Sequence, residues 1–152
     1  MKVLIINGPN LSRLDIRDSS LYGDLSYPQL VELITTHAAK LGFTADIRQS
    51  DDEAQIISWL HEAADQKLPV IINPAAFTHY SYAIRDAAEL VKTPLIEVHL
   101  SNPLSREEFR HTSVISGVAN GTIAGFGPNS YLLALEAMLN LLQNQTAEKP
   151  DC

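Results

Sequence analysis

The sequence has little of what marks secreted, membrane-spanning or nucleic-acid-binding proteins. Its single cysteine, Cys152, has no partner in the chain, so we expect no internal disulfide and a cytoplasmic protein. No apolar run reaches the ~18 residues of a membrane span, and no basic segment precedes a long apolar stretch as in a signal peptide. The net charge of −7 disfavours nucleic acid as a partner, because basic surfaces bind phosphates.

Residues for two kinds of cofactor or covalent chemistry are also missing. The five lysines lie at a terminus or near the ends of predicted helices, so none is placed to form a Schiff base with a substrate. No glycine-rich loop ends in Gly-Lys-Ser/Thr, and residues 125–130 hold only two of the three glycines of a dinucleotide fingerprint. We therefore predict no bound cofactor.

What is present is a regular alternation of short apolar runs and segments of helical spacing. The chain of 152 residues is 45% hydrophobic and 19% charged, as expected of one globular domain. The predicted strands cover residues 3–6, 44–49, 70–73, 95–98 and 118–125. The main predicted helices cover residues 25–41, 53–68, 83–91 and 128–142, with a short helical turn at 105–109.

This alternation predicts an α/β fold. Short connections between strands and helices indicate right-handed crossovers and a parallel sheet with helices on both faces. We predict a flavodoxin-like, doubly wound five-stranded parallel sheet in three α/β/α layers. Residues 1–142 would form a single domain and residues 143–152 a loose C-terminal tail.

Polar residues follow each predicted strand, at the edge where parallel sheets bind ligands. They form the segments 7–10, 49–51, 73–79 and 99–103. Amide, hydroxyl and imidazole groups on a rigid frame suit a small polyhydroxylated ligand. Each one alone is more simply a loop residue, but their concentration at one edge favours a site.

Two histidines, His79 and His99, lie at strand ends. Imidazole exchanges protons near neutral pH, so His99 is a natural general acid or base. Glu97 either orients the His99 ring or joins His79 and His99 in a metal site. We expect no metal, because a fourth ligand is missing. A buried core histidine remains an alternative for His79.

Arginines cluster in two of the predicted loops. Arg13 and Arg17 follow the first strand, and Arg106 and Arg110 share one face of a helical turn. In an acidic protein this clustering favours a local pocket for a carboxylate, although surface ion pairing explains Arg13 equally well. Tyr22 would need a neighbouring cation such as Arg17 to act as a base, since its reference pKa is about 10.

Six segments in order closely resemble the type II 3-dehydroquinate dehydratases. They are NGPNL (7–11), RDSSLYG (17–23), RQS (48–50), NPAAFTH (73–79), EVHLSN (97–102) and REEFR (106–110). The resemblance runs from residue 2 to about 142. It implies a flavodoxin-like fold, a dodecamer built as a tetramer of trimers, and elimination of water from 3-dehydroquinate to give 3-dehydroshikimate, without metal or Schiff base.

The resemblance also implies a role for each matching residue. Tyr22 would be the base, activated by Arg17. His99 would be the proton donor, oriented by Glu97, and Asn10 would stabilise the enolate through a bound water. The remaining implied contacts are to the substrate carboxylate (Asn73, Leu100, Ser101), the ring hydroxyls (His79, Arg110), the closed lid (Arg106) and a neighbouring subunit's site (Asp86).

The chain departs from the family pattern at a few positions. In the lid, Leu14-Asp15 replaces Leu-Gly and Asp18-Ser19 replaces Glu-Pro, changes that affect backbone freedom in opposite senses. Ala75-Ala76 replaces Gly-Gly, and we expect the added methyl groups to narrow the space in which the substrate approaches the backbone. Ser130 also stands where glycine is usual.

Two other classes of function remain as alternatives. One is a non-catalytic flavodoxin-like module that binds a small ligand, although the chain has Asn7-Gly8 where a receiver has its acidic pair. The other is a metal-dependent lyase that uses His79 and His99. For a dehydratase, both aromatic amino acid biosynthesis through the shikimate pathway and quinate catabolism fit the same reaction.

Overall fold

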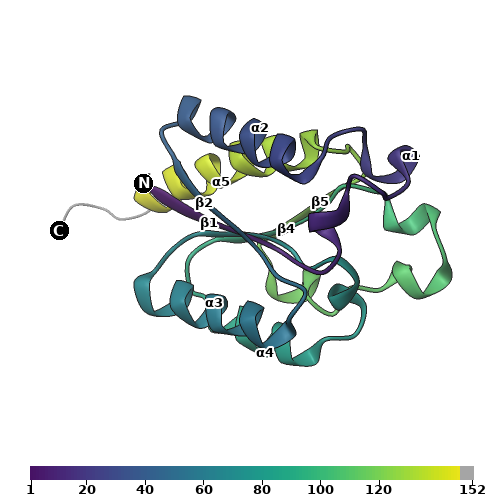
Figure 1. The fold of residues 1–152 in the computed structure, drawn as a ribbon. Helices are drawn as coiled ribbons and strands as arrows, with labels where there is room; N and C mark the ends of the chain where they lie inside the picture. The colour runs from purple at the N-terminus through teal and green to yellow at the C-terminus, as the bar shows by residue number, and fades with distance from the viewer. Residues whose placement is uncertain (148–152) are drawn as a thin grey trace.

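Five parallel strands form one sheet in the order β2-β1-β3-β4-β5, in the computed structural model, which describes residues 1–147. The strands are β1 (Lys2–Asn7), β2 (Thr44–Gln49), β3 (Val70–Asn73), β4 (Leu95–His99) and β5 (Gly121–Ala124). This order is that of the flavodoxin-like doubly wound sheet, so the predicted fold class is confirmed. β1 runs from the N-terminus toward the side of the molecule where the one-turn helix α1 (Ser19–Tyr22) lies (Figure 1).

Two pairs of helices cover the two faces of this sheet (Figure 1). α2 (Tyr27–Lys40) and α5 (Asn129–Ala147) pack on one face, and α3 (Glu53–Gln66) and α4 (Tyr82–Glu89) pack on the other. The resulting three layers match the predicted α/β/α arrangement. None of the helices within residues 1–147 has the length and apolar content needed to cross a membrane.

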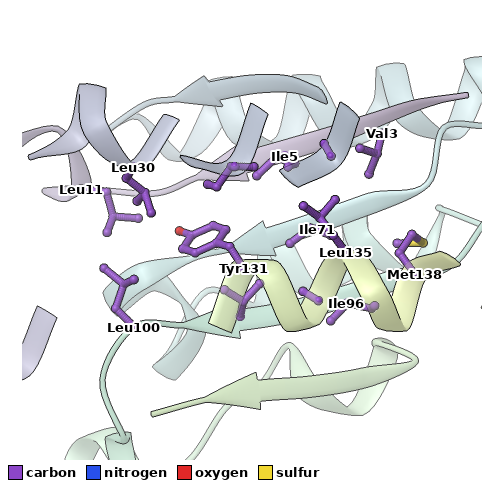
Figure 2. Packing of buried hydrophobic residues seen from close by; sticks show 14 of the residues in the cluster. Val3, Ile5, Leu11, Leu30, Ile71, Ile96, Leu100, Tyr131, Leu135 and Met138 are labelled. Carbon is purple, nitrogen blue, oxygen red and sulfur yellow. The ribbon is translucent and has the colours of Figure 1, made fainter. Parts of the chain in front are cut away.

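Side chains of β1 alternate between the two cores. Val3 and Ile5 face the layer of α2 and α5, whereas Leu4 and Ile6 face the layer of α3 and α4. All four are fully buried, which explains why the strand has no polar alternation in its sequence. Figure 2 shows the first core, where the sheet packs against Tyr131, Leu135 and Met138 of α5.

Polar side chains define where the helices begin. Ser26 and Gln29 form a reciprocal capping box at the start of α2, and Asp52 caps α3 through the Ala54 N–H. Ser130, where the family pattern has glycine, is buried, and its hydroxyl accepts a hydrogen bond from the Phe126 N–H over 3.1 Å. The serine therefore satisfies a backbone donor at the start of α5.

The structure corrects several predicted boundaries. α5 continues to Ala147, so the predicted loose tail is helical over residues 143–147, while residues 148–152, including Cys152, lie outside the described part of the chain. The predicted strand at 118–125 is shorter, because a 3-10 helix at Ser116–Val118 precedes β5. The predicted turn at 105–109 is two short 3-10 helices, Pro103–Ser105 and Glu108–His111.

Candidate active site

A hollow opens at the carboxyl ends of β1, β3 and β4. It is lined by Pro9, Asn10, Leu11, Arg17, Tyr22, Asn73, Ala75, Ala76, His79, His99, Leu100, Ser101, Pro103, Arg106 and Arg110. The lining includes all the predicted site residues except Glu97 and Asp86, so residues from five separate segments do converge at this edge.

One side of the hollow holds a tyrosine between two arginines. The Tyr22 hydroxyl accepts hydrogen bonds from Arg17 and, over 2.7 Å, from Arg106. The Arg17 guanidinium carbon also lies 3.6 Å from the centre of the Tyr22 ring. Two guanidiniums therefore donate hydrogen bonds to one phenol oxygen.

The arginines crowd one another as well as the tyrosine. Burial, together with the charges of Arg106 and Arg110, lowers the pKa of Arg17, although its interaction with Tyr22 works in the opposite direction. Arg106 is held in place by a second hydrogen bond, from its Nη1 to the Ser101 hydroxyl over 3.0 Å. This excess of positive charge suits an anionic ligand.

Tyr22 is presented by a capped turn in the loop after β1. Asp18 accepts hydrogen bonds from the Ser20 N–H (2.9 Å) and the Ser20 hydroxyl (2.7 Å), which starts the one-turn helix α1. Gly23, with φ of 87°, ends that helix directly after Tyr22. Asp18, which departs from the family pattern, thus adds local hydrogen bonds to this loop.

The other side of the hollow holds His99 with a buried carboxylate behind it. Glu97 and His99 are two residues apart on β4 and therefore project from the same face of the strand. His99 Nε2 is hydrogen-bonded to Glu97 Oε2. Glu97 is fully buried and does not line the hollow, which fits the predicted orienting carboxylate rather than a direct substrate contact.

Three hydroxyls complete the surroundings of Glu97. Thr78 donates over 2.6 Å, Ser116 over 2.7 Å and Ser113 over 3.0 Å. Burial raises the pKa of Glu97. The hydrogen bond and charge of His99, together with the hydroxyls of Thr78 and Ser116, lower this pKa by a larger amount, so the net shift is downward. Sequence analysis missed these hydroxyls, because serine and threonine in loops carry no pattern that indicates what they contact.

These contacts also bear on the metal alternative. Both carboxylate oxygens of Glu97 already accept hydrogen bonds. Within residues 1–147 no three histidine, cysteine, aspartate or glutamate residues gather as metal ligands. The Nδ1 atom of His79 lies 2.8 Å from the Thr112 carbonyl oxygen. It is partly exposed and lines the hollow, so the alternative of a buried core histidine is wrong.

The base of the hollow is formed by the ends of β1 and β3. Asn73 is buried, and its side-chain amide is held by the Tyr131 hydroxyl and the Ala75 N–H. Ala75 has φ of 52°, a left-handed conformation that is strained for alanine and explains why glycine is usual there. Gly8 lies so close to Pro74 that a Cβ would sit 2.6 Å from the Pro74 carbonyl oxygen.

Asn10 lies where the loop after β1 begins. Its φ is 69°, and its backbone N–H donates to Asp51 Oδ1 over 2.9 Å. Gln49 donates both to Asp51 Oδ1 (3.0 Å) and to the Gly8 carbonyl (3.1 Å). The end of β2 therefore anchors the loop that carries Asn10, Arg17 and Tyr22.

Arg13 and Asp86 lie outside the hollow, and Arg110 lies in it. Arg13 is exposed and pairs with Asp15 over 3.1 Å, so it belongs to a surface ion pair and not to the anion pocket. Asp86 is exposed on α4 and does not line the hollow of its own chain. Arg110 lines the hollow and pairs with Glu107 at its rim.

Comparison with known proteins points to one family. The sequence profile described as Dehydroquinase class II matches residues 1–139. The chain is 53% identical to the 3-dehydroquinate dehydratase of Salinispora tropica over 135 residues, 89% of this chain and 94% of that protein. It is 50% identical to the one of Caldicellulosiruptor bescii over 142 residues, 93% and 98% of the two chains.

Solved structures agree with the sequence comparison. The type II dehydroquinase of Propionibacterium acnes superposes with a TM-score of 0.89 at 45% identity, covering 91% of this chain and 96% of the other. A 3-dehydroquinate dehydratase-like protein of Bifidobacterium longum gives a TM-score of 0.72 at 44% identity over 94% and 98% of the two chains. With its flavodoxin-like fold and its match along residues 1–139, the chain belongs to the class II dehydroquinase family.

Proposed function

We propose that the chain is a 3-dehydroquinate dehydratase, a hydro-lyase that removes water from 3-dehydroquinate to give 3-dehydroshikimate. The observation that carries this proposal is the placement of Tyr22 and His99 in one hollow, with cationic groups beside Tyr22 and an anionic group beside His99. Tyr22 is backed by two guanidiniums and His99 by a buried carboxylate. Two titratable groups in such different surroundings suit separate roles as base and acid.

The reaction needs a base, a stabiliser for the enolate and an acid. Tyr22, as phenolate, takes the proton from the carbon next to the ketone, and the electron pair of that C–H bond forms the enolate. When the ketone forms again, a C=C bond is made and the C–O bond to the β-hydroxyl breaks. His99 gives its proton to the departing oxygen, so water leaves. Tyr22 then holds one proton and His99 lacks one, and exchange with solvent restores both.

The surrounding residues have distinct parts in this proposal. Arg17 stabilises the phenolate of Tyr22, and Glu97 fixes the ring of His99 and balances its positive charge. Asn10 holds a water molecule against the enolate oxygen. Arg106, which bridges Tyr22 and Ser101, holds the lid closed over the substrate.

Further residues bind the substrate without taking part in proton transfer. We assign the carboxylate to Asn73 and to the backbone around Leu100 and Ser101. His79 and Arg110, which also line the hollow, bind ring hydroxyls.

The remaining parts of the proposal concern the assembly and the cell. Asp86 reaches the site of a neighbouring subunit in a dodecamer built as a tetramer of trimers, which accounts for its exposure here. No metal or other cofactor takes part. The enzyme acts in the cytoplasm, in the shikimate pathway or in quinate catabolism.

An absorbance assay tests the activity. Purified protein is mixed with 3-dehydroquinate, and the ultraviolet absorbance of the conjugated product is followed with and without a metal chelator. We expect an absorbance rise that the chelator leaves unchanged, and no trapped adduct on lysine after borohydride treatment with substrate. Folded protein that binds quinate but gives no absorbance rise would instead support the non-catalytic binding module.

A further inference from the structure

A buried hydrogen-bonded bridge joins β1 and β3 beneath the hollow. The Tyr131 hydroxyl, carried by α5, donates to Asn7 Oδ1 over 2.6 Å and accepts from Asn73 Nδ2 over 2.9 Å. Asn7 and Asn73 end adjacent strands and are partners in the sheet register. Asn73 lines the hollow, whereas Tyr131 is fully buried and does not. Among the residues that line the hollow, Tyr131 is therefore hydrogen-bonded to Asn73 alone.

One backbone N–H determines the direction of the hydrogen bonds in this bridge. The Ala75 N–H can only donate, and it lies 3.1 Å from one end of the Asn73 amide, which must therefore be the carbonyl oxygen. The amide NH2 of Asn73 then faces Tyr131. The Tyr131 hydroxyl accepts a hydrogen bond from this NH2 and donates one to the side-chain oxygen of Asn7. Since an amide has two N–H donors, Asn73 retains one for a ligand in the hollow.

The surroundings of Tyr131 keep this arrangement in place. Burial raises the pKa of Tyr131, and the hydrogen bond from Asn73 lowers it by less, so the hydroxyl keeps its proton. The ring packs in the core, and its hydroxyl points toward the side that holds Leu11 and Leu100, two residues that also line the hollow (Figure 2). The ring is fully buried within this core.

We propose that Tyr131 is a positioning residue for recognition of the substrate carboxylate, because it holds Asn73 with an N–H toward the hollow. A carboxylate only accepts hydrogen bonds, so an amide turned with its oxygen toward the ligand would repel it. This inference rests on the proposed function, since it takes Asn73 to bind the carboxylate.

The test compares Tyr131→Phe with wild type using quinate and its primary amide as probes. Quinate has the carboxylate, and the amide offers a neutral group of similar shape. We expect Tyr131→Phe to weaken quinate binding and raise KM by about tenfold, with kcat changed less than about twofold and binding of the amide nearly unchanged. Equal losses for the two probes would show a merely structural role and overturn the inference.

Tyr27→Phe is the matched control. The Tyr27 hydroxyl accepts from Asn7 Nδ2 over 3.4 Å but does not contact Asn73. We expect this variant to keep the wild-type preference for quinate over the amide. A loss of preference as large as that of Tyr131→Phe would assign the effect to general loosening of the core, and would also overturn the inference.

Asn73→Ala separates this inference from the proposed function on which it rests. If Asn73→Ala leaves the preference for quinate intact, the assignment of Asn73 to the carboxylate fails. If Asn73→Ala abolishes the preference but Tyr131→Phe does not, only the role of Tyr131 fails. In the double variant, Tyr131→Phe should add no further increase in KM, because its effect passes through Asn73.

A second variant covers the case in which Tyr131→Phe does not fold. Asn7→Ala removes the acceptor that directs the Tyr131 proton away from Asn73, while the tyrosine ring stays in the core. We expect a loss of preference for quinate in the same direction. Unchanged preference in folded Asn7→Ala protein would count against the proposed polarity of the bridge.

Discussion

The two sides of the hollow place their reactive groups by different means. His99 and Glu97 lie on β4, in the interior of the sheet, and Glu97 is surrounded by three hydroxyl donors from two other segments. Tyr22 lies on a four-residue helix in a loop, where Arg17 and Arg106 hold its hydroxyl. The proposed acid, His99, is thus carried by a central strand, whereas the proposed base, Tyr22, is buried against the core of α2 and α5 but is carried by a loop and held by side-chain contacts.

This difference has a consequence for motion and stability. Loops with few buried contacts open at lower free energy than central strands. Arg106 links the two sides, because it contacts both Tyr22 and Ser101, the latter just beyond β4. Substitutions on the base side should change activity alone, and those on the acid side should change activity and stability.

The largest effect is expected for Tyr22→Phe. Without the phenol oxygen the proposed base is missing, so kcat should fall by roughly 10³-fold or more. The free energy of unfolding and the affinity for quinate should remain near wild type, measured by denaturant titration and calorimetry. Substantial residual turnover would show that another group is the base.

Arg17→Ala comes next, with Arg13→Ala as its matched control in the same loop. Removing the cation on the Tyr22 oxygen should lower kcat by about 10²-fold, because an electrostatic contact to the developing charge is lost. Arg13 pairs only with Asp15 at the surface, so its removal should change kcat by less than about twofold. Similar losses in both variants would mean that loop order, and not the contact to Tyr22, is responsible.

Thr78→Val should affect both activity and stability. It leaves buried Glu97 one hydrogen bond short, at a cost of about 1–3 kcal/mol in the free energy of unfolding. A less firmly held Glu97 should also lower kcat by about tenfold. Thr35→Val, at an exposed site on α2, is the control and should leave both quantities near wild type. Loss of activity without loss of stability would contradict the contrast between the two sides.

The lowered pKa of Glu97 predicts a dependence of stability on pH. Its folded-state value lies below the usual 4.5, so its contribution to stability is fully present above that pH and is lost as pH falls through the lowered value. Glu97→Gln should therefore be less stable than wild type at neutral pH, and the gap should close in acid. Chemical denaturation between pH 7 and pH 3 measures this, and a gap independent of pH would refute it.

The smallest effect is expected for Ala75→Gly. Relief of the left-handed strain should exceed the added freedom of the unfolded chain, so the free energy of unfolding should rise by about 0.5–1 kcal/mol. Ala76→Gly, at a position outside that conformation, should lower stability by a similar amount. Thermal melts of the two variants compare them directly, and a shift of the same sign in both would contradict the strain at Ala75.

Much of the fold was predictable because its signals are local. Unbroken apolar runs such as residues 3–6 indicated buried parallel strands, and capping residues such as Asp52 marked where helices begin. The end of α5 was not predictable in this way, since the apolar stripe ends at Leu142 while the helix continues in polar residues to Ala147. Helix propensity without burial leaves no periodic pattern to follow.

Local sequence indicated which polar residues follow the strands, and the family resemblance assigned Tyr22, His99 and Asn73 to one site. The contacts that support these residues depend on packing between distant segments. Thr78 meets Glu97 from 19 residues away, and Tyr131 meets Asn73 from 58 residues away. Such contacts depend on how separate segments pack over the sheet, and no local pattern records them. The reactive groups can therefore be predicted from the sequence, while their orientation arises from packing between distant elements.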